Sequence, residues 1–550
     1  MPKQKATEAT GETSAAKRPR VIENVDELLW KGYGQQLVFG NAVHLESSKS
    51  IFLVGQLKAL EAFAKKPAGS VPESVVERVN TFIRMKSGSD SPATPSQTVE
   101  YLVDGGQLRK VVIVCVPHEA SRNNNVIRHQ FLHQDRRSVV PGKSFISTNK
   151  EKDPARPDAV ARALVKFPEF TGMDDNPITV LALGSMSSDA AATGLAVARA
   201  SHKLNFSSKR AKKLTELAKS NIVVWSGDGE KVDVGRLSVV AENIRRAALL
   251  TELPANLLNT RTYLKAIKDI VGELRGKGRI EVKVIEGEEL EEQGFGGMWN
   301  VGKASPGDKS IALVGKGIVY DTGGLAIKTK DGMMGMKSDM GGSAGLLGAF
   351  AALVETEKLK KPLHFIGCLA ENSIGPESYR QGDVITLYSG LTVEVNNTDC
   401  EGRLVLADGV AYAAKHLDPE MIIDMATLTY AQSVVTGSSH AAIFSNCESL
   451  EKDAVDAGKT SGDLVYPVLF CPEVHKAQLR SDIADLKNQP TPGAGCSCAG
   501  SFIYENLIAA AGNDDIKFLH VDMASFSTNL DGRASGFGVA LVHQLLKNDA

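Results

Sequence analysis

The chain of 550 residues alternates short strand-like runs with helical stretches over most of its length. In its C-terminal half, β-branched runs bounded by Gly, Pro or Asn predict buried strands, and longer stretches with an apolar period near 3.6 predict helices. The predicted strands are 309–317, 362–372, 391–397, 420–428 and 516–524, and the predicted helices are 341–359 and 403–417. This alternation favours a mixed, largely parallel sheet covered by helices. Sites in such sheets form beyond the carboxyl ends of the strands.

A smaller α/β unit precedes this half. The runs at 110–117 and 177–184 predict buried strands, and 188–204 predicts a helix with Ser187 or Ser188 as its candidate N-cap. The unit has no glycine fingerprint and no tight cluster of ligand-type residues, which favours a role in assembly or regulation. We therefore predict an α/β fold in two domains. The predicted divisions are a disordered leader (1–20), an N-terminal α/β domain (21–235), a connecting helix (236–255) and a C-terminal domain (256–550).

Charge and cysteine content argue against several protein classes. With 63 Lys and Arg against 65 Asp and Glu, the net charge of −2 gives no reason to expect nucleic acid or an anionic membrane as the main partner. Seven cysteines make no disulfide framework and fit a reduced, cytoplasmic protein. Cys496 and Cys498 form a C-x-C pair, but only Cys471 is near in sequence, so a zinc–thiolate site is not favoured. No apolar run approaches the length of a membrane-spanning helix.

Seven charged residues lie near predicted strand ends in glycine-rich surroundings. They are Lys316, Asp321, Lys328, Asp339, Asp399, Glu401 and Arg403. Each has an ordinary alternative: Asp339 as a helix N-cap, Lys328 as a surface lysine, and the acidic pair after the third strand as solvated turn residues. Taken together, four converging carboxylates would repel one another unless cations compensate.

The composition of this group indicates a carboxylate-rich metal site. Carboxylate oxygens bind hard and borderline divalent cations readily. Residues two apart in an extended chain point the same way, so we expect Asp399 and Glu401 to face one metal pair, with Arg403 beside them. Because no His lies among these residues, a two-metal carboxylate centre is favoured over a His-rich single zinc site.

At these residues the sequence resembles the leucyl aminopeptidase (M17 cytosol aminopeptidase) family of dinuclear zinc exopeptidases. The family signature Asn-Thr-Asp-Ala-Glu-Gly-Arg-Leu appears as NTDCEGRL, and GKGIVYDTGG, KSDMGG and DMATLT match in order and spacing. The resemblance covers about residues 235–550 and is strongest to the branch named "probable aminopeptidase-like". The family's N-terminal domain is also α/β, which agrees with the fold predicted above.

The resemblance implies a metal-binding role for five residues. Lys316, Asp321, Asp339 and Glu401 would hold a tightly bound metal, and Asp321, Asp399 and Glu401 would hold a more exchangeable one. Asp321 and Glu401 would then bridge, and Asp399 would also lend its backbone carbonyl. Lys316 would have to be neutral, with its pKa lowered by burial and by the metal charge. Zinc is the expected metal, with manganese, cobalt or magnesium as alternatives.

The resemblance also implies a mechanism. Lys328 would stabilise the oxyanion, and Arg403 would hold a bicarbonate ion as general base toward a metal-bridging hydroxide. The exchangeable metal would bind the α-amine of the substrate, and Leu428 would contact its leaving portion through the backbone. The expected activity is release of N-terminal, leucine-like residues from peptides by a homohexamer. A Cys-Gly or other dipeptidase or amidase on the same centre, and a binding protein without activity, are the alternatives.

Two positions near the site depart from the family pattern. Cys400 replaces the usual alanine, and its side chain should point away from the metals if the chain is extended there. Tyr430 replaces a glycine near the substrate pocket, so the residue preference stays open.

Overall fold

The structure is a computed structural model of the whole chain. It describes residues 35–548 except 43–44, 46–47, 68–70, 87–95, 105–106, 117–163, 165–166, 168–169, 171–176, 202–217, 275, 278–279, 286–308, 491–492 and 526–532. The leader predicted over 1–20 therefore lies outside the described residues. None of the described helices combines the length and the apolar character that crossing a membrane requires.

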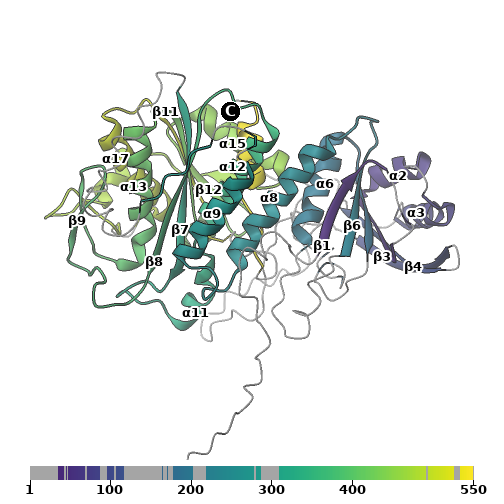
Figure 1. Cartoon of the computed structure of the whole chain (residues 1–550), viewed down its shortest axis with the longest axis horizontal. Helices are drawn as coiled ribbons and strands as arrows, with labels where there is room; N and C mark the ends of the chain where they lie inside the picture. The colour runs from purple at the N-terminus through teal and green to yellow at the C-terminus, as the bar shows by residue number, and fades with distance from the viewer. Residues whose placement is uncertain are drawn as a thin grey trace, which may run out of the picture.

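The N-terminal domain is a six-stranded sheet with helices on both faces (Figure 1). Its strands are β1 (Gln35–Gly40), β2 (Ser50–Gln56), β3 (Ser96–Asp104), β4 (Gln107–Val116), β5 (Ile178–Gly184) and β6 (Ala218–Ser226), in the order β1-β6-β5-β2-β4-β3. Only the β3–β4 pair is antiparallel. Its described helices are α2 (Leu57–Lys65), α3 (Glu73–Lys86) and α6 (Ser187–Ala200). Alternate residues of β2 enter two separate apolar clusters, as expected for a parallel sheet buried on both faces.

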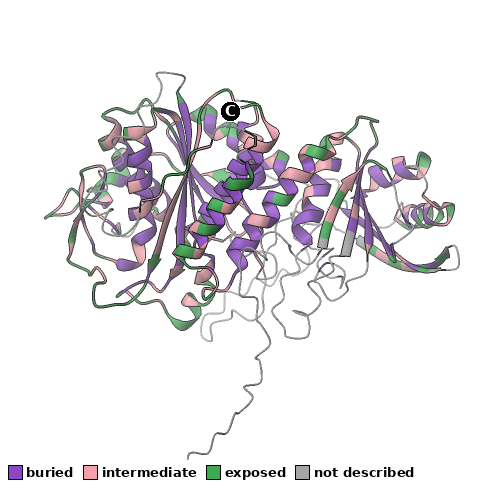
Figure 2. Cartoon of the chain, viewed as in Figure 1, coloured by how far each residue is buried: buried purple, intermediate pink, exposed green. Residues whose placement is uncertain are grey.

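The C-terminal domain has a second six-stranded sheet, in the order β13-β12-β15-β11-β7-β8. Its strands are β7 (Ser310–Asp321), β8 (Leu363–Asn372), β11 (Pro419–Ala426), β12 (Ala441–Ser445), β13 (Val465–Pro467) and β15 (Lys517–Asp522). All pairs are parallel except β12–β15, which confirms the predicted mixed, largely parallel sheet. In Figure 2 its strands are largely purple, because helices cover them, except for the edge strand β8, which is mostly of intermediate burial and pink.

The helices of this domain form two layers. On one face lie α8 (Val234–Glu252), α9 (Thr260–Leu274), α12 (Gly341–Thr356), α15 (Glu448–Ser461) and α18 (Val539–Leu546). On the other lie α13 (Glu401–His416) and α17 (Gly495–Ala511). Shorter helices are α11 (Lys330–Met333), α14 (Tyr430–Val435), α16 (Pro472–Gln478) and the 3₁₀ turns η2 (Met336–Ser338) and η3 (Thr398–Cys400).

Two local predictions were wrong. The strand predicted at 391–397 is only β10 (Thr392–Glu394), which pairs with β9 (Val384–Thr386) and β14 (Leu486–Lys487) in a small separate sheet. The helix α6 has Met186 as its N-cap, without a side-chain bond. Instead, the carboxylate of Asp228 accepts the N–H of Ser187 at 3.1 Å, so a residue from the next βα turn supplies the acceptor that helix starts require.

The helix α8 packs against both domains and lies between the two sheets in Figure 1. Leu237, near its start, packs in an apolar cluster of the N-terminal sheet, while Ile244 and Leu250 belong to the C-terminal core. The carboxylate of Asp233 caps its N-terminus by accepting the N–H of Arg236. The chain then leaves the helix at Leu253, just before Pro254.

A buried ion pair also joins the domains. The Nη1 of Arg199 on α6 lies 2.8 Å from Oδ1 of Asp463, and both side chains are fully buried. The other oxygen of Asp463 accepts the N–H groups of Gly538 and Leu541 at the start of α18. One carboxylate therefore connects a helix of the N-terminal domain to the last helix of the chain.

We predict that Arg199→Met lowers the free energy of unfolding by about 3–5 kcal/mol, because it leaves the buried charge of Asp463 without its cation. The midpoint of urea unfolding measures the loss. Arg380→Met, at an exposed pair with Asp383, is the matched control and should change stability by no more than about 0.5 kcal/mol. Equal midpoints for the two variants would contradict the prediction.

Candidate metal centre

The strand β7 carries two of the predicted ligands. It runs to Asp321, four residues beyond the predicted end. Lys316 and Asp321 are five residues apart, so a regular strand would point them to opposite faces. Between the pairs Ile318–Ala370 and Asp321–Asn372, however, β7 has one more residue than β8. This bulge shifts the alternation by one and lets both side chains reach the same cluster.

Three carboxylates meet at the carboxyl end of β7. Oxygen atoms of Asp321, Asp339 and Glu401 lie within 4.8 Å of one another, and all three residues are buried. The ammonium group of Lys316 lies 2.7 Å from Oδ2 of Asp339 and 3.1 Å from Oε1 of Glu401, and it donates to the carbonyl of Thr427 at 2.9 Å. The N-cap of α12 is Met340, so the alternative role of Asp339 as the N-cap of this helix does not apply.

A second lysine extends the cluster toward solvent. The Nζ of Lys328 lies 2.8 Å from Oδ2 of Asp321 and 2.5 Å from Oδ1 of Asp399. The side chain of Asp399 is 31% exposed, whereas that of Asp339 is 7% exposed. Six of the seven predicted charged residues are thus linked by ion pairs, with an inner group around Lys316 and an outer group around Lys328.

The backbone beside these residues differs from the extended chain we expected. Residues Thr398–Cys400 form the 3₁₀ turn η3, which the side chain of Asn397 starts by accepting the N–H of Asp399, and Glu401 is the first residue of α13. A tight turn, and not a two-residue strand repeat, brings Asp399 and Glu401 to the cluster. We expected the side chain of Cys400 to point away from the metals on condition that the chain is extended there. Because the chain forms a turn, that condition is not met. Burial raises the pKa of its thiol.

An uncharged residue that the sequence analysis missed connects the cluster. The Nδ2 of Asn372, at the end of β8, donates to Oδ1 of Asp321 at 2.9 Å, to the carbonyl of Thr398 at 3.0 Å and to Oε2 of Glu401 at 3.2 Å. The available signal was a polar residue closing a predicted strand. The hydroxyl of Thr427 likewise donates to Oδ1 of Asp339 at 2.7 Å.

The remaining predicted residues belong to segments that contribute to the cluster or directly follow them. Arg403 is buried in the first turn of α13, and its Nε and Nη1 have no hydrogen-bond partner among the described residues. Leu428 follows β11 and is half-buried, and its N–H donates to Asp522. Tyr430 begins α14 and is 84% exposed.

Charge compensation determines the protonation of the inner group. Burial lowers the pKa of Lys316, but the carboxylates of Asp339, Glu401 and Asp321 outweigh it, and the pKa is raised above its usual value. Lys316 is therefore an ammonium here, and only the charge of a metal could replace its proton. Burial raises the pKa of Asp339 to about 7 against the charge of Lys316. Oxygen donors this close, with one lysine among them, fit a divalent cation.

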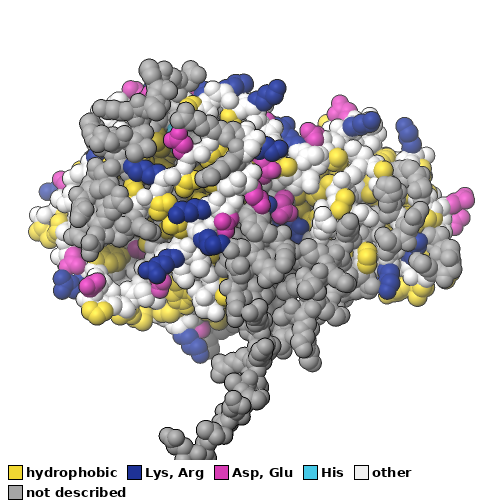
Figure 3. Space-filling model, in the orientation of Figure 1, with side chains coloured by type: hydrophobic (Ala, Val, Ile, Leu, Met, Phe, Trp, Pro, Cys, Tyr) yellow, Lys and Arg dark blue, Asp and Glu magenta, His cyan; other side chains and the backbone are white. Residues whose placement is uncertain are grey.

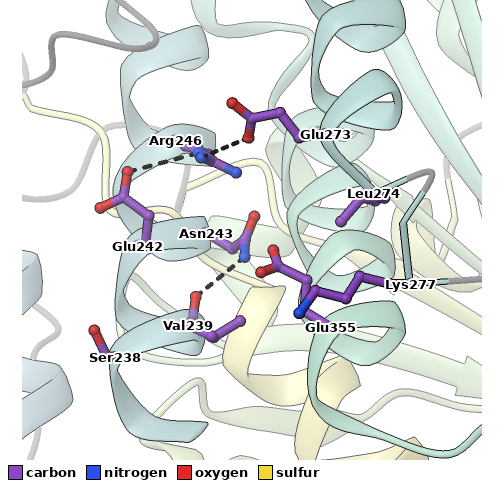
Figure 4. Close-up of a pocket in the computed structure, with 9 residues that line it drawn as sticks. All are labelled: Ser238, Val239, Glu242, Asn243, Arg246, Glu273, Leu274, Lys277 and Glu355. Atoms are coloured by element: carbon purple, nitrogen blue, oxygen red, sulfur yellow. Dashed lines mark hydrogen bonds and ion pairs between the residues drawn. The ribbon is translucent and has the colours of Figure 1, made fainter. Parts of the chain in front are cut away.

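A pocket elsewhere in the domain has no part in this cluster. It lies between α8, α9 and α12 and is lined by Ser238, Val239, Glu242, Asn243, Arg246, Glu273, Leu274, Lys277 and Glu355 (Figure 4). Arg246 pairs there with Glu242 and Glu273. None of the predicted site residues lines it.

Comparison with known proteins agrees with this geometry. Residues 245–543 match the sequence profile described as "Cytosol aminopeptidase family, catalytic domain". The chain belongs to the cytosol aminopeptidase family. It is 45% identical to "Probable aminopeptidase NPEPL1" of Homo sapiens over 335 residues, which are 57% of this chain and 62% of that protein. It is 44% identical to "Leucine aminopeptidase 1" of Caenorhabditis elegans over 328 residues, which are 56% of this chain and 65% of that protein. Each match spans less than two thirds of the relative.

Solved structures of family members resemble both domains of the chain. Leucyl aminopeptidase from Leishmania major, in complex with actinonin, superposes with a TM-score of 0.75 at 32% identity and covers 97% of this chain and 100% of that one. The apo leucyl aminopeptidase from Trypanosoma cruzi gives a TM-score of 0.74 at 33% identity, over 94% and 97%. The two-domain α/β fold is therefore that of the family.

We predict that protons compete with divalent metal at the inner group. Asp339, with a pKa raised to about 7, binds a proton as the pH falls, and Lys316 must lose one to become a ligand. The apparent zinc affinity should therefore fall as the pH is lowered from 8 to 6. Competition with a chromophoric chelator measures it. Asp456→Asn, on the exposed side of α15, should keep the same dependence, and a constant affinity across this range would count against the assignment.

Proposed function

We propose that the chain is a metal-dependent aminopeptidase that releases N-terminal residues from peptides. The observation that supports it best is the buried convergence of Asp321, Asp339 and Glu401 in a chain of the cytosol aminopeptidase family. Three acidic groups are not buried together without a cation to balance them. The two groups of ion pairs, one around Lys316 and one around Lys328, are adjacent because oxygen atoms of Asp321, Asp339 and Glu401 lie close together, which agrees with two adjacent cation positions.

Five residues would hold two divalent ions, with zinc expected and manganese, cobalt or magnesium as alternatives. They are Lys316, Asp321, Asp339, Asp399 and Glu401. When bound, such a pair lowers the pKa of a shared water and polarises the scissile carbonyl. Asn372 would keep Asp321 and Glu401 in place, as partners of ligating carboxylates do. Lys316 would lose its proton on binding.

Lys328 would remain cationic at the open side of the site. Burial lowers its pKa, but Asp321 and Asp399 outweigh burial and raise it. Its side chain is 16% exposed, against 3% for Lys316, so a substrate would approach past Lys328 and Asp399. A fixed ammonium there would stabilise the oxyanion that develops during peptide hydrolysis. Leu428 would contact the substrate through its backbone, and Lys328 and Asp399 would also bind the substrate.

Arg403 would bind the bicarbonate that serves as general base. Its buried guanidinium has two nitrogens without a protein partner among the described residues. A guanidinium fork matches a planar oxyanion in shape and charge. Such an anion would take the proton of the attacking water. The carboxylates are poorly placed to accept it, because they are already paired with cations.

The proposal extends to preference, assembly and location. We expect a leucine-like preference, which the exposed ring of Tyr430, shortly after Leu428 in the chain, would modify. We also expect a homohexamer in the cytoplasm. We propose peptides as the partners, and expect neither nucleic acid nor membrane as the main one. On the face in Figure 3, basic and acidic side chains are interspersed outside the grey atoms. The alternative is a dipeptidase or amidase, such as a Cys-Gly dipeptidase, on the same centre.

Substrates with a free or a blocked amine test the proposed activity. We predict that leucine amide is cleaved and its N-acetyl form is not, because the free α-amine would be needed as a metal ligand. Dialysis against a chelator should abolish cleavage, and zinc, manganese or cobalt should restore it. Glu401→Ala should stay inactive with added metal, while Glu448→Ala, on the surface of α15, should behave as wild type. Equal cleavage of the blocked amide would favour a general amidase.

Variants of the two cationic residues test their separate roles. Lys328→Met should lower kcat about 100- to 1000-fold with the metal content unchanged, because it removes a charge that acts on the transition state. Arg403→Met should make the rate insensitive to added bicarbonate. Lys361→Met, at a surface pair with Glu420, is the control for loss of a lysine. If Arg403→Met still responded to bicarbonate as wild type does, the anion would bind elsewhere.

A further inference from the structure

A second buried charged group lies in the C-terminal sheet, outside the proposed chemistry. It consists of Asp424 on β11 and of His520 and Asp522 on β15, each no more than 1% exposed. Asp424 and His520 are direct partners across the two parallel strands, and Nδ1 of His520 lies 2.5 Å from Oδ1 of Asp424. His520 and Asp522 are two residues apart on one strand and therefore share a face.

Asp522 holds the segment that leaves β11. Its Oδ1 accepts the N–H groups of Leu428 and Thr429, each at 3.2 Å, and that of Ala524 at 3.3 Å. Its Oδ2 accepts the hydroxyl of Thr429 at 2.5 Å. Only an ionised carboxylate accepts hydrogen bonds on both oxygens without carrying a donor of its own. An amide or a protonated acid at this position would point its own N–H or O–H group at one of the N–H or O–H groups that donate to Asp522.

The held segment touches the candidate metal ligands one residue earlier. The carbonyl of Thr427 accepts from Nζ of Lys316 at 2.9 Å, and its hydroxyl donates to Oδ1 of Asp339 at 2.7 Å. A shift of Leu428 and Thr429 would therefore move the carbonyl and the hydroxyl of Thr427, which contact Lys316 and Asp339. Leu428 itself is the proposed backbone contact of the substrate.

His520 supplies the charge that Asp522 needs in this buried setting. Burial raises the pKa of Asp522, and the charge of His520 opposes that rise. Burial lowers the pKa of His520, but Asp424 outweighs it and the net shift is upward. The charged groups that face His520 are Asp424 from β11, Asp522 from β15 and Arg403 from α13. Because two carboxylates and only one other cation face His520, its side chain is favoured in the protonated, positively charged form.

We propose that Asp424, His520 and Asp522 form a positioning relay for the metal centre. Asp424 orients His520, His520 balances the charge of Asp522, and Asp522 fixes residues 427–429 and, through Thr427, the inner ligands. All three are positioning residues, since their hydrogen bonds run to one another and to residues 428, 429 and 524, and not to a proposed metal ligand. The inference rests on the proposed function for its kinetic readout, but its metal-binding readout does not need activity.

Isosteric variants of the metal-loaded full chain test the relay. Asp522→Asn, Asp424→Asn and His520→Gln should each lower zinc affinity and kcat/KM for leucine amide about 10- to 100-fold. The double variant His520→Gln/Asp522→Asn should lose no more than the larger single loss, because the two residues act in one chain of contacts. Asp463→Asn, which alters an equally buried carboxylate of the domain junction, is the matched control. It should lower the unfolding midpoint and keep zinc affinity and kcat/KM.

The outcomes separate the relay from a role in stability alone and from failure of the proposed function. If the relay variants lose only stability, as Asp463→Asn does, or if the losses of the double variant multiply, the relay is overturned. If wild type binds zinc but cleaves no amide, the proposed function fails while zinc affinity still tests the relay. Should His520→Gln not fold, Asp424→Asn, which keeps a partner for the imidazole but removes the charge, carries the same test.

Discussion

A buried ammonium group holds the functional end of this protein together. Lys316 neutralises carboxylates that come from two other segments, and removing one partner of such a pair costs about 3–5 kcal/mol. The backbone leaves room for it: a Cβ at Gly402 would lie 2.6 Å from its Cε and 2.7 Å from its Nζ. The start of α12 also packs closely on β7, since a Cβ at Gly315 would lie 2.4 Å from Cα of Ser343. These two glycines therefore allow the backbone to lie close to the Lys316 side chain and to the start of α12.

The parallel sheet determines which segments meet there. The strands β11, β7 and β8 are neighbours with the same direction, so their carboxyl ends form one edge. Asp321 and Asn372 come from the ends of β7 and β8, and Thr427 follows β11. The helices α12 and α13 begin at the same edge and bring Asp339 and Glu401. The site is thus built where an open α/β sheet exposes polar groups between covered faces.

Sequence reasoning predicted what depends on local pattern. Apolar β-branched runs identified β7, β8, β11 and β15, and the glycine-rich segments identified the charged residues, of which the structure links six by ion pairs. It could not predict what depends on pairing between distant segments. The bulge of β7 exists only against β8, and His520 meets Asp424 only because β15 lies beside β11. The sequence predicts an extended chain at Thr398–Cys400 instead of the observed turn, because charges two residues apart occur equally in a strand and in a tight turn.

The arrangement of charges implies how the site would accept metal. The carboxylates already surround a cation, the ammonium of Lys316. Asn372 and Thr427 hold three of the acidic groups, Asp321, Glu401 and Asp339, through hydrogen bonds. A divalent ion would replace the positive charge of a proton on Lys316 by its own, while the hydrogen bonds of these neutral partners stay the same. Binding would then release protons more than it would reorganise the backbone. Preorganisation of this kind reduces the free energy that ordering the ligands would otherwise require, so the lysine would serve first as a stand-in for the metal and then as its ligand.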